Sequence, residues 1–234
     1  MKYKVILFDL DGTLLPMDQI VFAKTYFGLM AKKLANHGYN PEKLVESILI
    51  GTKAMVLNDS GKTNEEVFWD RMVEIYGEDI KKDIKNFDQF YIEDFDKVKV
   101  SSGYNELSPL VIKKLKEKGY RLVLATNPIF PKIATQKRMI WAGIEKEDFE
   151  FYTTYENSSH CKPNLKYYQD ILNILKVNAE DCLMVGNDVG EDMVAEKLGI
   201  NVFLLTDCLI NKENKDISSY PQGTLQDLMK FLEI

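Results

Sequence analysis

The sequence has few cysteines, and their placement does not suit cross-linking. Its 234 residues include three, Cys161, Cys182 and Cys208, which lie far apart and are odd in number. No Cys-x-x-Cys pair is present, which argues against a disulfide framework and against a zinc knuckle. We therefore expect a protein of the reducing cytoplasm.

An excess of basic charge is also absent. Lysine and arginine number 30 against 36 aspartates and glutamates, which gives a formal net charge of −6. General nucleic-acid binding requires a basic face, so no nucleic-acid partner is expected. A few local donors can still hold a small anion, because the mean charge does not set the potential of a single crevice.

Long apolar runs are missing as well. The first run, Val5–Phe8, is too short for the core of a signal peptide. No run approaches the ~20 residues that span a bilayer, so no membrane partner is expected. The hydrophobic fraction of 45% nevertheless supports a substantial core, arranged as one large domain or two small ones.

The sequence does contain short apolar runs without alternation, the pattern of strands buried on both faces of a parallel sheet. The runs are Val5–Phe8, Leu122–Ala125, Cys182–Val185 and Val202–Leu205, with a weaker one over 149–153. Amphipathic helical patterns lie between the runs from about residue 100 onward, and this alternation indicates βαβ units. We predict an α/β fold with a Rossmann-like parallel sheet flanked by helices.

Residues 17–99 have a different pattern, without a convincing strand. Apolar residues at helical spacing predict four helices there, one beginning behind Thr63 and the last over 80–95. We predict a smaller, all-helical domain over 17–99. It is inserted after the first strand of a core domain that consists of residues 1–16 and 100–234.

Polar clusters follow three of the predicted strands. They are Asp9-Leu10-Asp11-Gly12-Thr13, Thr126-Asn127, and Gly186-Asn187-Asp188 with Asp192 four residues further on. In open parallel sheets, ligands bind outside the carboxyl ends of the strands, so these clusters converge if the strands are neighbours. Lys162, in a loop before a helical pattern, can supply a cation to the same crevice.

The acidic residues of these clusters favour a hard metal ion. Asp9, Asp11 and Asp188 offer oxygen ligands, with no imidazole or thiolate among them. Such a set suits Mg²⁺, which prefers oxygen and keeps several waters. Without a cation, three carboxylates in one crevice would repel one another, so the cluster and the metal imply each other.

The other polar residues favour a phosphate. Thr126 and Asn127 are neutral donors and Lys162 is a cation, a combination that suits this anion. An aspartate can attack phosphorus and form an aspartyl-phosphate. A second carboxylic acid two residues on can protonate the leaving oxygen and then activate water.

The ordered set of Asp-Leu-Asp-Gly-Thr, Thr-Asn, Lys-Pro and the acidic Gly-Asn-Asp cluster resembles the haloacid dehalogenase superfamily, in its phosphatase branch. The matching motifs lie within residues 5–192. The resemblance implies that Asp9 is the nucleophile and a Mg²⁺ ligand. It also implies that Asp11 is the general acid and base, binding the metal through its main-chain carbonyl, and that Asp188 is the acidic metal ligand.

The same resemblance implies roles for the remaining residues. Thr126 and Asn127 correspond to the strand end that holds the phosphate, and Lys162 to the lysine that neutralises the nucleophile and the phosphoryl group. Asp192 corresponds to a supporting residue that binds water or orients the metal ligand. Glu191, its neighbour in the sequence, stays open as the alternative for that supporting role.

The function implied by the resemblance is a Mg²⁺-dependent phosphatase that hydrolyses a small phosphorylated metabolite through an aspartyl-phosphate. The helical insertion resembles the cap of such enzymes, and Lys53 is a candidate substrate contact within it. A sugar phosphomutase and a catalytically silent, phosphate-binding regulatory protein stay open as alternatives. A dehalogenase is disfavoured because that branch lacks the second aspartate, present here as Asp11. No oligomeric state is predicted.

Overall fold

A parallel sheet of six strands lies at the centre of the fold in the computed structural model, which describes residues 2–234. The strands are β1 (Val5–Phe8), β2 (Arg121–Leu124), β3 (Phe151–Tyr152), β4 (Cys182–Gly186), β5 (Asn201–Leu205) and β6 (Gln222–Gly223). They lie in the order β3-β2-β1-β4-β5-β6, and all neighbours are parallel. The predicted α/β fold is confirmed, and the five predicted strands are all present.

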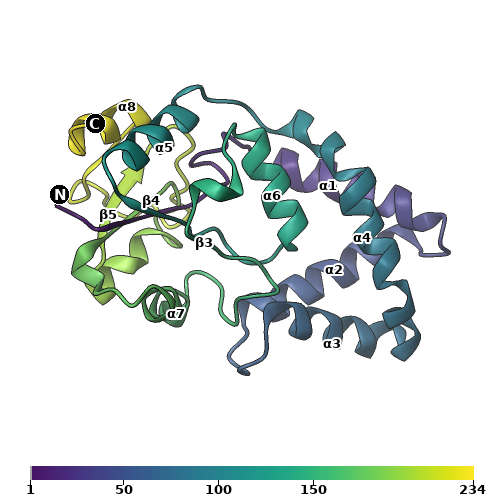
Figure 1. The fold of residues 1–234 in the computed structure, drawn as a ribbon. Helices are drawn as coiled ribbons and strands as arrows, with labels where there is room; N and C mark the ends of the chain where they lie inside the picture. Colours follow the sequence, from purple (N-terminus) through teal and green to yellow (C-terminus); the bar gives the residue numbers. More distant parts are fainter. Residues whose placement is uncertain (1) are drawn as a thin grey trace.

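Helices precede and follow the strands along the chain (Figure 1). The α-helices are α1 (Gln19–Ala35), α2 (Pro41–Val56), α3 (Asn64–Tyr76), α4 (Ile84–Glu93), α5 (Leu107–Glu117), α6 (Lys132–Trp141), α7 (Leu165–Leu175) and α8 (Leu225–Phe231). The 3₁₀ helices are η1 (Glu78–Asp83), η2 (Phe95–Ser101), η3 (Lys146–Asp148), η4 (Ala179–Asp181) and η5 (Met193–Leu198). None of these helices in residues 2–234 is long and apolar enough to cross a membrane.

The apolar strand runs are continuous because the sheet is covered on both faces. Successive side chains of a strand point to opposite sides of a sheet. Ile6 and Phe8 pack into one cluster with residues of α5, α6 and α8. Val5 and Leu7 pack into a second cluster with residues of α7 and η5. Every residue of β1 is therefore buried. The position of β1 in the sheet thus sets where the residues that follow it, beginning with Asp9, lie.

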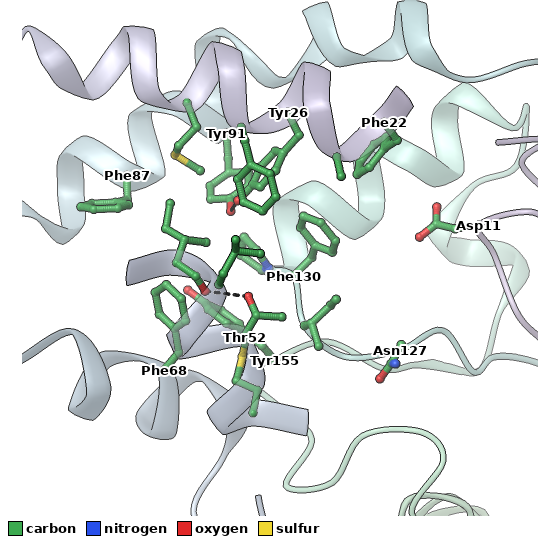
Figure 2. Close-up of a pocket in the computed structure, with 18 of the residues that line it drawn as sticks. Asp11, Phe22, Tyr26, Thr52, Phe68, Phe87, Tyr91, Asn127, Phe130 and Tyr155 are labelled. Carbon is green, nitrogen blue, oxygen red and sulfur yellow. Dashed lines mark hydrogen bonds between the residues drawn. The ribbon is translucent and has the colours of Figure 1, made fainter. Parts of the chain in front are cut away.

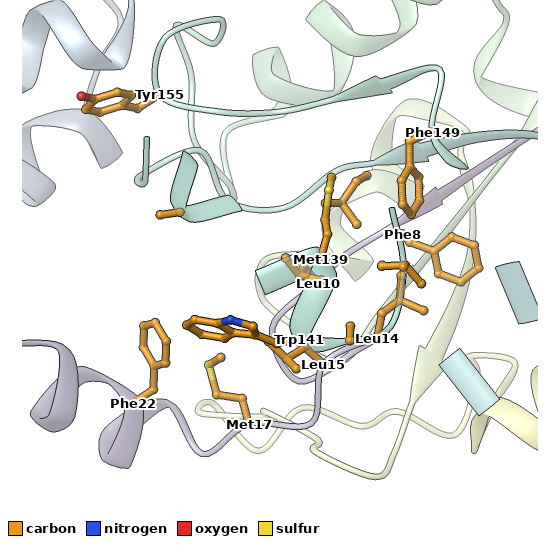
Figure 3. Packing of buried hydrophobic residues seen from close by; sticks show 14 of the residues in the cluster. Phe8, Leu10, Leu14, Leu15, Met17, Phe22, Met139, Trp141, Phe149 and Tyr155 are labelled. Atoms are coloured by element: carbon orange, nitrogen blue, oxygen red, sulfur yellow. The ribbon is translucent and has the colours of Figure 1, made fainter. Parts of the chain in front are cut away.

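Residues 19–101, between β1 and α5, form the helical segment of the fold. Its third helix begins as the sequence predicts, with a capping box in which Thr63 accepts from the Glu66 N–H and Glu66 from the Thr63 N–H. The predicted last helix is divided into η1 and α4. The segment packs on the core through aromatic rings: Phe95 stacks on Trp141 with ring centroids 5.1 Å apart. Figure 3 shows this packing continuing from Phe22 towards the sheet.

Two connections join the helical segment to the sheet, and they run side by side. Met17 and Ser102 form an antiparallel bridge, and the Gly103 N–H donates to the Pro16 carbonyl over 2.7 Å. A Cβ at Gly103 would lie 3.1 Å from the Pro16 side chain, so glycine permits this close approach. The chain thus leaves the core and returns to it at one place.

Candidate active site

Asp9 follows β1 directly, at the carboxyl end of the central strand. Its N–H donates to the Val185 carbonyl over 2.9 Å, which extends the pairing with β4 by one residue. The two side-chain oxygens have different neighbours. Lys162 Nζ donates to Asp9 Oδ1 over 2.9 Å, and the Thr13 hydroxyl lies 3.0 Å from Asp9 Oδ2. The carboxylate is therefore held in one orientation at the edge of the sheet.

A tight turn brings the two aspartates of the first motif to this edge. Gly12 has φ +87°, a conformation that residues with a side chain rarely adopt. A Cβ at this position would also overlap the side chain of Asn187. The Thr13 hydroxyl lies 3.0 Å from Asn187 Oδ1 as well, so the first and last motifs are in direct contact.

Lys162 is a buried cation between two carboxylates. Its side chain is 1% exposed, and Nζ donates to Asp9 Oδ1 over 2.9 Å and to Asp192 Oδ1 over 2.6 Å. Burial opposes the charged form of Lys162, but the carboxylates of Asp192 and Asp9 outweigh it and raise its pKa well above the usual range. Lys162 is thus a permanent positive charge beside Asp9, where the sequence predicts one.

Asp192 is occupied by structural contacts rather than open to the crevice. Besides accepting from Lys162, it accepts through Oδ2 from the Asp188 N–H over 2.9 Å. Burial raises the pKa of Asp192 to about 7. A Cβ at Gly186 would overlap its carboxylate, so the strand end has room for Asp192 only because residue 186 is glycine. These contacts fit the supporting role predicted for Asp192.

Asp188 shapes the loop after β4. Its Oδ1 accepts from the N–H groups of Gly190 and Glu191, over 2.7 and 3.0 Å. The side chain of Glu191 points elsewhere, and its Oε2 accepts from Asn127 Nδ2 over 3.0 Å. Burial raises the pKa of Glu191. Glu191 is therefore a partner of Asn127, the residue predicted to hold phosphate.

Hydrogen bonds from two hydroxyl groups hold the main chain that follows β2 in place. The Thr126 carbonyl accepts from the Thr153 hydroxyl over 2.6 Å and from the Tyr167 hydroxyl over 2.9 Å. Asn127 Oδ1 is buried without a hydrogen-bond partner among the described residues. An unsatisfied buried amide oxygen is costly. Thr126 and Asn127 thus lie at the same edge of the sheet as Asp9.

Asp11 forms a part-buried ion pair with Arg138, which the sequence did not predict. Arg138 of α6, 1% exposed, donates from a terminal guanidinium nitrogen to Asp11 Oδ2. The guanidinium also lies over the Phe130 ring, 4.5 Å from its centroid. Burial raises the pKa of Asp11, while Arg138 opposes that rise. Asp11 Oδ1 is buried and has no hydrogen-bond partner in the described part of the chain.

A cavity of about 260 Å³ lies between the helical segment and this edge of the sheet. Asp11 and Asn127 line one end of it, and aromatic rings that include Tyr26, Phe68 and Phe87 surround the other (Figure 2). Thr52 of α2 lines the cavity, whereas its neighbour Lys53, the predicted substrate contact, is exposed and lies outside the lining.

The chemistry of the predicted metal ligands fits Mg²⁺. Within residues 2–234, no three His, Cys, Asp or Glu side chains form a complete metal site. Mg²⁺ does not require one, because it is commonly bound through one or two carboxylates, waters and substrate phosphate. The carboxylates of Asp9 and Asp188 and the main-chain carbonyl of Asp11 supply hard oxygens of this kind.

Comparison with known proteins decides the family. The family model for haloacid dehalogenase-like hydrolases matches residues 3–199 of the chain. The chain belongs to the haloacid dehalogenase-like hydrolase family. A curated relative, pyrophosphatase PpaX of Bacillus mycoides, is 26% identical over 192 residues, which cover 80% of this chain and 76% of the relative.

Solved structures of the family share the fold. A predicted phosphoglycolate phosphatase of Haemophilus somnus superposes with a TM-score of 0.62 at 19% identity, covering 99% of each chain. A protein named YfnB of Bacillus subtilis, solved with bound magnesium, superposes with a TM-score of 0.57 at 15% identity over the full length of both chains. The family predicted from the motifs is confirmed, and the chain is a hydrolase of the haloacid dehalogenase-like type.

Proposed function

We propose that the protein is a Mg²⁺-dependent phosphatase that hydrolyses a small phosphorylated metabolite through an aspartyl-phosphate on Asp9. One observation carries this proposal: Asp9 is oriented by Lys162 and Thr13, two residues ahead of Asp11, whose Oδ1 is buried and unpartnered. A carboxylate nucleophile and a carboxylic acid with a free oxygen are the two groups that such a reaction requires.

The residues would act in two steps. In the first, an Asp9 oxygen attacks phosphorus, the bond from phosphorus to the leaving oxygen breaks, and the Asp11 proton passes to that oxygen. In the second, Asp11 takes a proton from water, whose oxygen attacks phosphorus as the bond to Asp9 breaks. Inorganic phosphate then leaves. The raised pKa of Asp11 supports this role because it increases the protonated fraction needed in the first step.

The charges around Asp9 fit a phosphoryl group. Lys162 would offset the negative charge of the nucleophile and of the phosphoryl oxygens throughout. Asp9, Asp188 and the Asp11 carbonyl would hold Mg²⁺, which supplies the positive charge that stabilises phosphoryl transfer. Asn127, kept in place by Glu191, would bind the phosphate through the second N–H of its Nδ2 group. The relative named pyrophosphatase and the neighbour bound to magnesium support this assignment.

Residues 17–99 are proposed to be the cap of this enzyme, inserted into a core of residues 1–16 and 100–234. The paired connections at Met17–Ser102 and Pro16–Gly103 support these boundaries. A lid joined to the core at one place can close as a unit and exclude water from the site. The cavity enclosed beneath the segment is where a substrate would be covered.

The test is hydrolysis of p-nitrophenyl phosphate, with release of inorganic phosphate as the readout. We expect turnover with Mg²⁺, none in EDTA, and none in the Asp9→Asn variant. Asp79→Asn, which changes an exposed aspartate of η1, is the matched control and should remain active. With a ³²P-labelled ester, label should be trapped on the unaltered protein and not on Asp9→Asn.

Three results would contradict the proposal. Full turnover after chelation would show that the reaction needs no metal. Label trapped on Asp9→Asn would show that another residue is the nucleophile. Transfer of the phosphoryl group to a sugar instead of water would identify a mutase.

A further inference from the structure

The shape and charge of the cavity indicate what the substrate carries beyond its phosphate. We propose that the phosphate ester hydrolysed here has an uncharged, apolar leaving group, such as an aromatic ring on a short alkyl chain. The inference rests on the proposed phosphatase function and adds the chemistry of the leaving group to it.

The leaving group would occupy the cavity that Asp11 lines. Asp11, as the proposed acid, must face the leaving oxygen, and Asp11 lines the cavity together with Asn127 and Glu191. From these residues the cavity extends between the core and helices α1 to α4 (Figure 2). The group attached to that oxygen therefore lies under the helical segment, away from Asp9 and Lys162.

Most of the walls of this space are rings and aliphatic side chains, and Gln19, Thr52 and Asp88 also line it. Phe22 and Phe130 lie near the Asp11 end, and Tyr26, Phe68 and Phe87 lie further in. The rings hold one another in place, since the centroid of Trp69 is 5.2 Å from those of both Phe68 and Phe87. The hydroxyls of Tyr26 and Tyr91 bond to each other over 2.7 Å. Rigid apolar walls of this kind favour an apolar ligand.

The charge of the lining excludes an anionic leaving group. The charged side chains that line the cavity are Asp11, Asp88 and Glu191, all acidic, and no lysine, arginine or histidine among the described residues lines it. Arg138, the nearest cation to Asp11, is engaged by that residue. A carboxylate or phosphate entering the cavity would lose its water and gain no positive partner, which is strongly unfavourable.

This chemistry separates the protein from the substrates that its relatives' names suggest. Cleavage of pyrophosphate releases phosphate as the leaving group, and cleavage of phosphoglycolate releases a carboxylate. Both would place an anion in an acidic, apolar space. The size is also informative: a cavity of about 260 Å³ has room for one ring and a short chain.

The test compares three primary alkyl phosphates with leaving alcohols of similar basicity: 2-phenylethyl phosphate, butyl phosphate and 4-phosphonooxybutanoate. The last has the chain length of butyl phosphate but ends in a carboxylate. We expect kcat/KM with Mg²⁺ to be highest for the phenylethyl ester and to exceed that of the carboxylate ester by at least about 100-fold. Butyl phosphate should fall between them.

Thr52→Lys places a cation in the cavity. The ratio of kcat/KM for the phenylethyl ester to kcat/KM for the carboxylate ester should fall at least tenfold in this variant. Thr52 lines the cavity and donates only to the Ile48 carbonyl of its own helix, over 2.9 Å. Ile50→Lys is the matched control, because it adds the same charge to an exposed position of α2 outside the lining, and the ratio should not change. Asp88→Asn, an isosteric change at an exposed position, should lower the ratio in the same direction by less.

The outcomes separate this inference from the proposed function. Turnover with the carboxylate ester equal to or faster than the phenylethyl ester would overturn the apolar leaving group and leave the phosphatase standing. So would a ratio that falls equally in Thr52→Lys and Ile50→Lys. Hydrolysis of none of the esters, with no label on Asp9, would overturn both.

Discussion

Replacing Lys162 with methionine should destabilise the fold in a way that depends on pH. Methionine keeps most of the buried volume and removes the charge. The ammonium lies 2.9 Å from Asp9 Oδ1 and 2.6 Å from Asp192 Oδ1. At an effective dielectric constant of about 20, each contact supplies roughly 6 kcal/mol of attraction before the cost of desolvation.

The net loss should be smaller than that gross attraction but still large. Breaking a buried ion pair by removing one partner typically costs about 3–5 kcal/mol, because the remaining charge is left uncompensated. Total stabilities of about 5–15 kcal/mol leave such a variant folded but weakened. Urea denaturation of the Lys162→Met variant should therefore show a free energy of unfolding lower by about 3–5 kcal/mol near neutral pH.

The pH dependence follows from the sign of the pKa shift of Asp192. Its pKa is raised to about 7 in the folded protein, from an ordinary value of 3.8. A raised pKa contributes stability that is present below about pH 4 and is lost as pH rises through the folded value. Without Lys162 that pKa rises further, so the deficit of Lys162→Met should be larger at pH 8 than at pH 5.

A second substitution tests the cause. Asp192→Asn removes one of the two carboxylates, so the double variant with Lys162→Met should be more stable at pH 8 than Lys162→Met alone. A deficit that is equal at pH 5 and pH 8 would refute the electrostatic reasoning and assign the loss to packing. A double variant less stable than the single one would refute it as well.

Three further substitutions test the site. Asp11→Asn should slow phosphoenzyme formation from an alkyl phosphate by roughly 10²–10⁴-fold and from p-nitrophenyl phosphate by less; equal losses in single-turnover kinetics would contradict the role of general acid. Arg138→Met removes the charge that opposes the raised pKa of Asp11, so the alkaline decline of that step should move to higher pH, which Arg138→Lys should not cause. Gly186→Ala would overlap Asp192 and should cost roughly 1–3 kcal/mol in urea denaturation; unchanged stability would contradict the packing.

Local sequence patterns predicted those elements whose structure depends on residues close together in the sequence. The run Val5–Phe8 predicts β1 because a strand covered on both faces must be apolar throughout. The Thr63 capping box predicts the start of α3 because its hydrogen bonds join residues three apart. The break between η1 and α4 was missed, since apolar spacing does not distinguish 3₁₀ from α geometry over one turn.

The candidate site was predictable to the same extent. The sequence predicted that the aspartate cluster after β1 and the acidic cluster after β4 meet if their strands are neighbours, and the structure shows that β1 and β4 are neighbours. Arg138 of α6 was not singled out from the sequence. Arg138 is buried on this helix, where its Nε donates to the Ala134 carbonyl over 3.3 Å.

The sequence by itself determined the α/β class, the strand runs, the helical insertion and the order of polar motifs, since each depends on neighbours a few residues apart. Only the tertiary structure decided which charges meet. Arg138 pairs with Asp11 across 127 positions, and Asn127 with Glu191 across 64. The raised pKa of Asp11 and the acidic, apolar cavity have the same origin, because burial and the nearest charges are set by segments that only folding brings together.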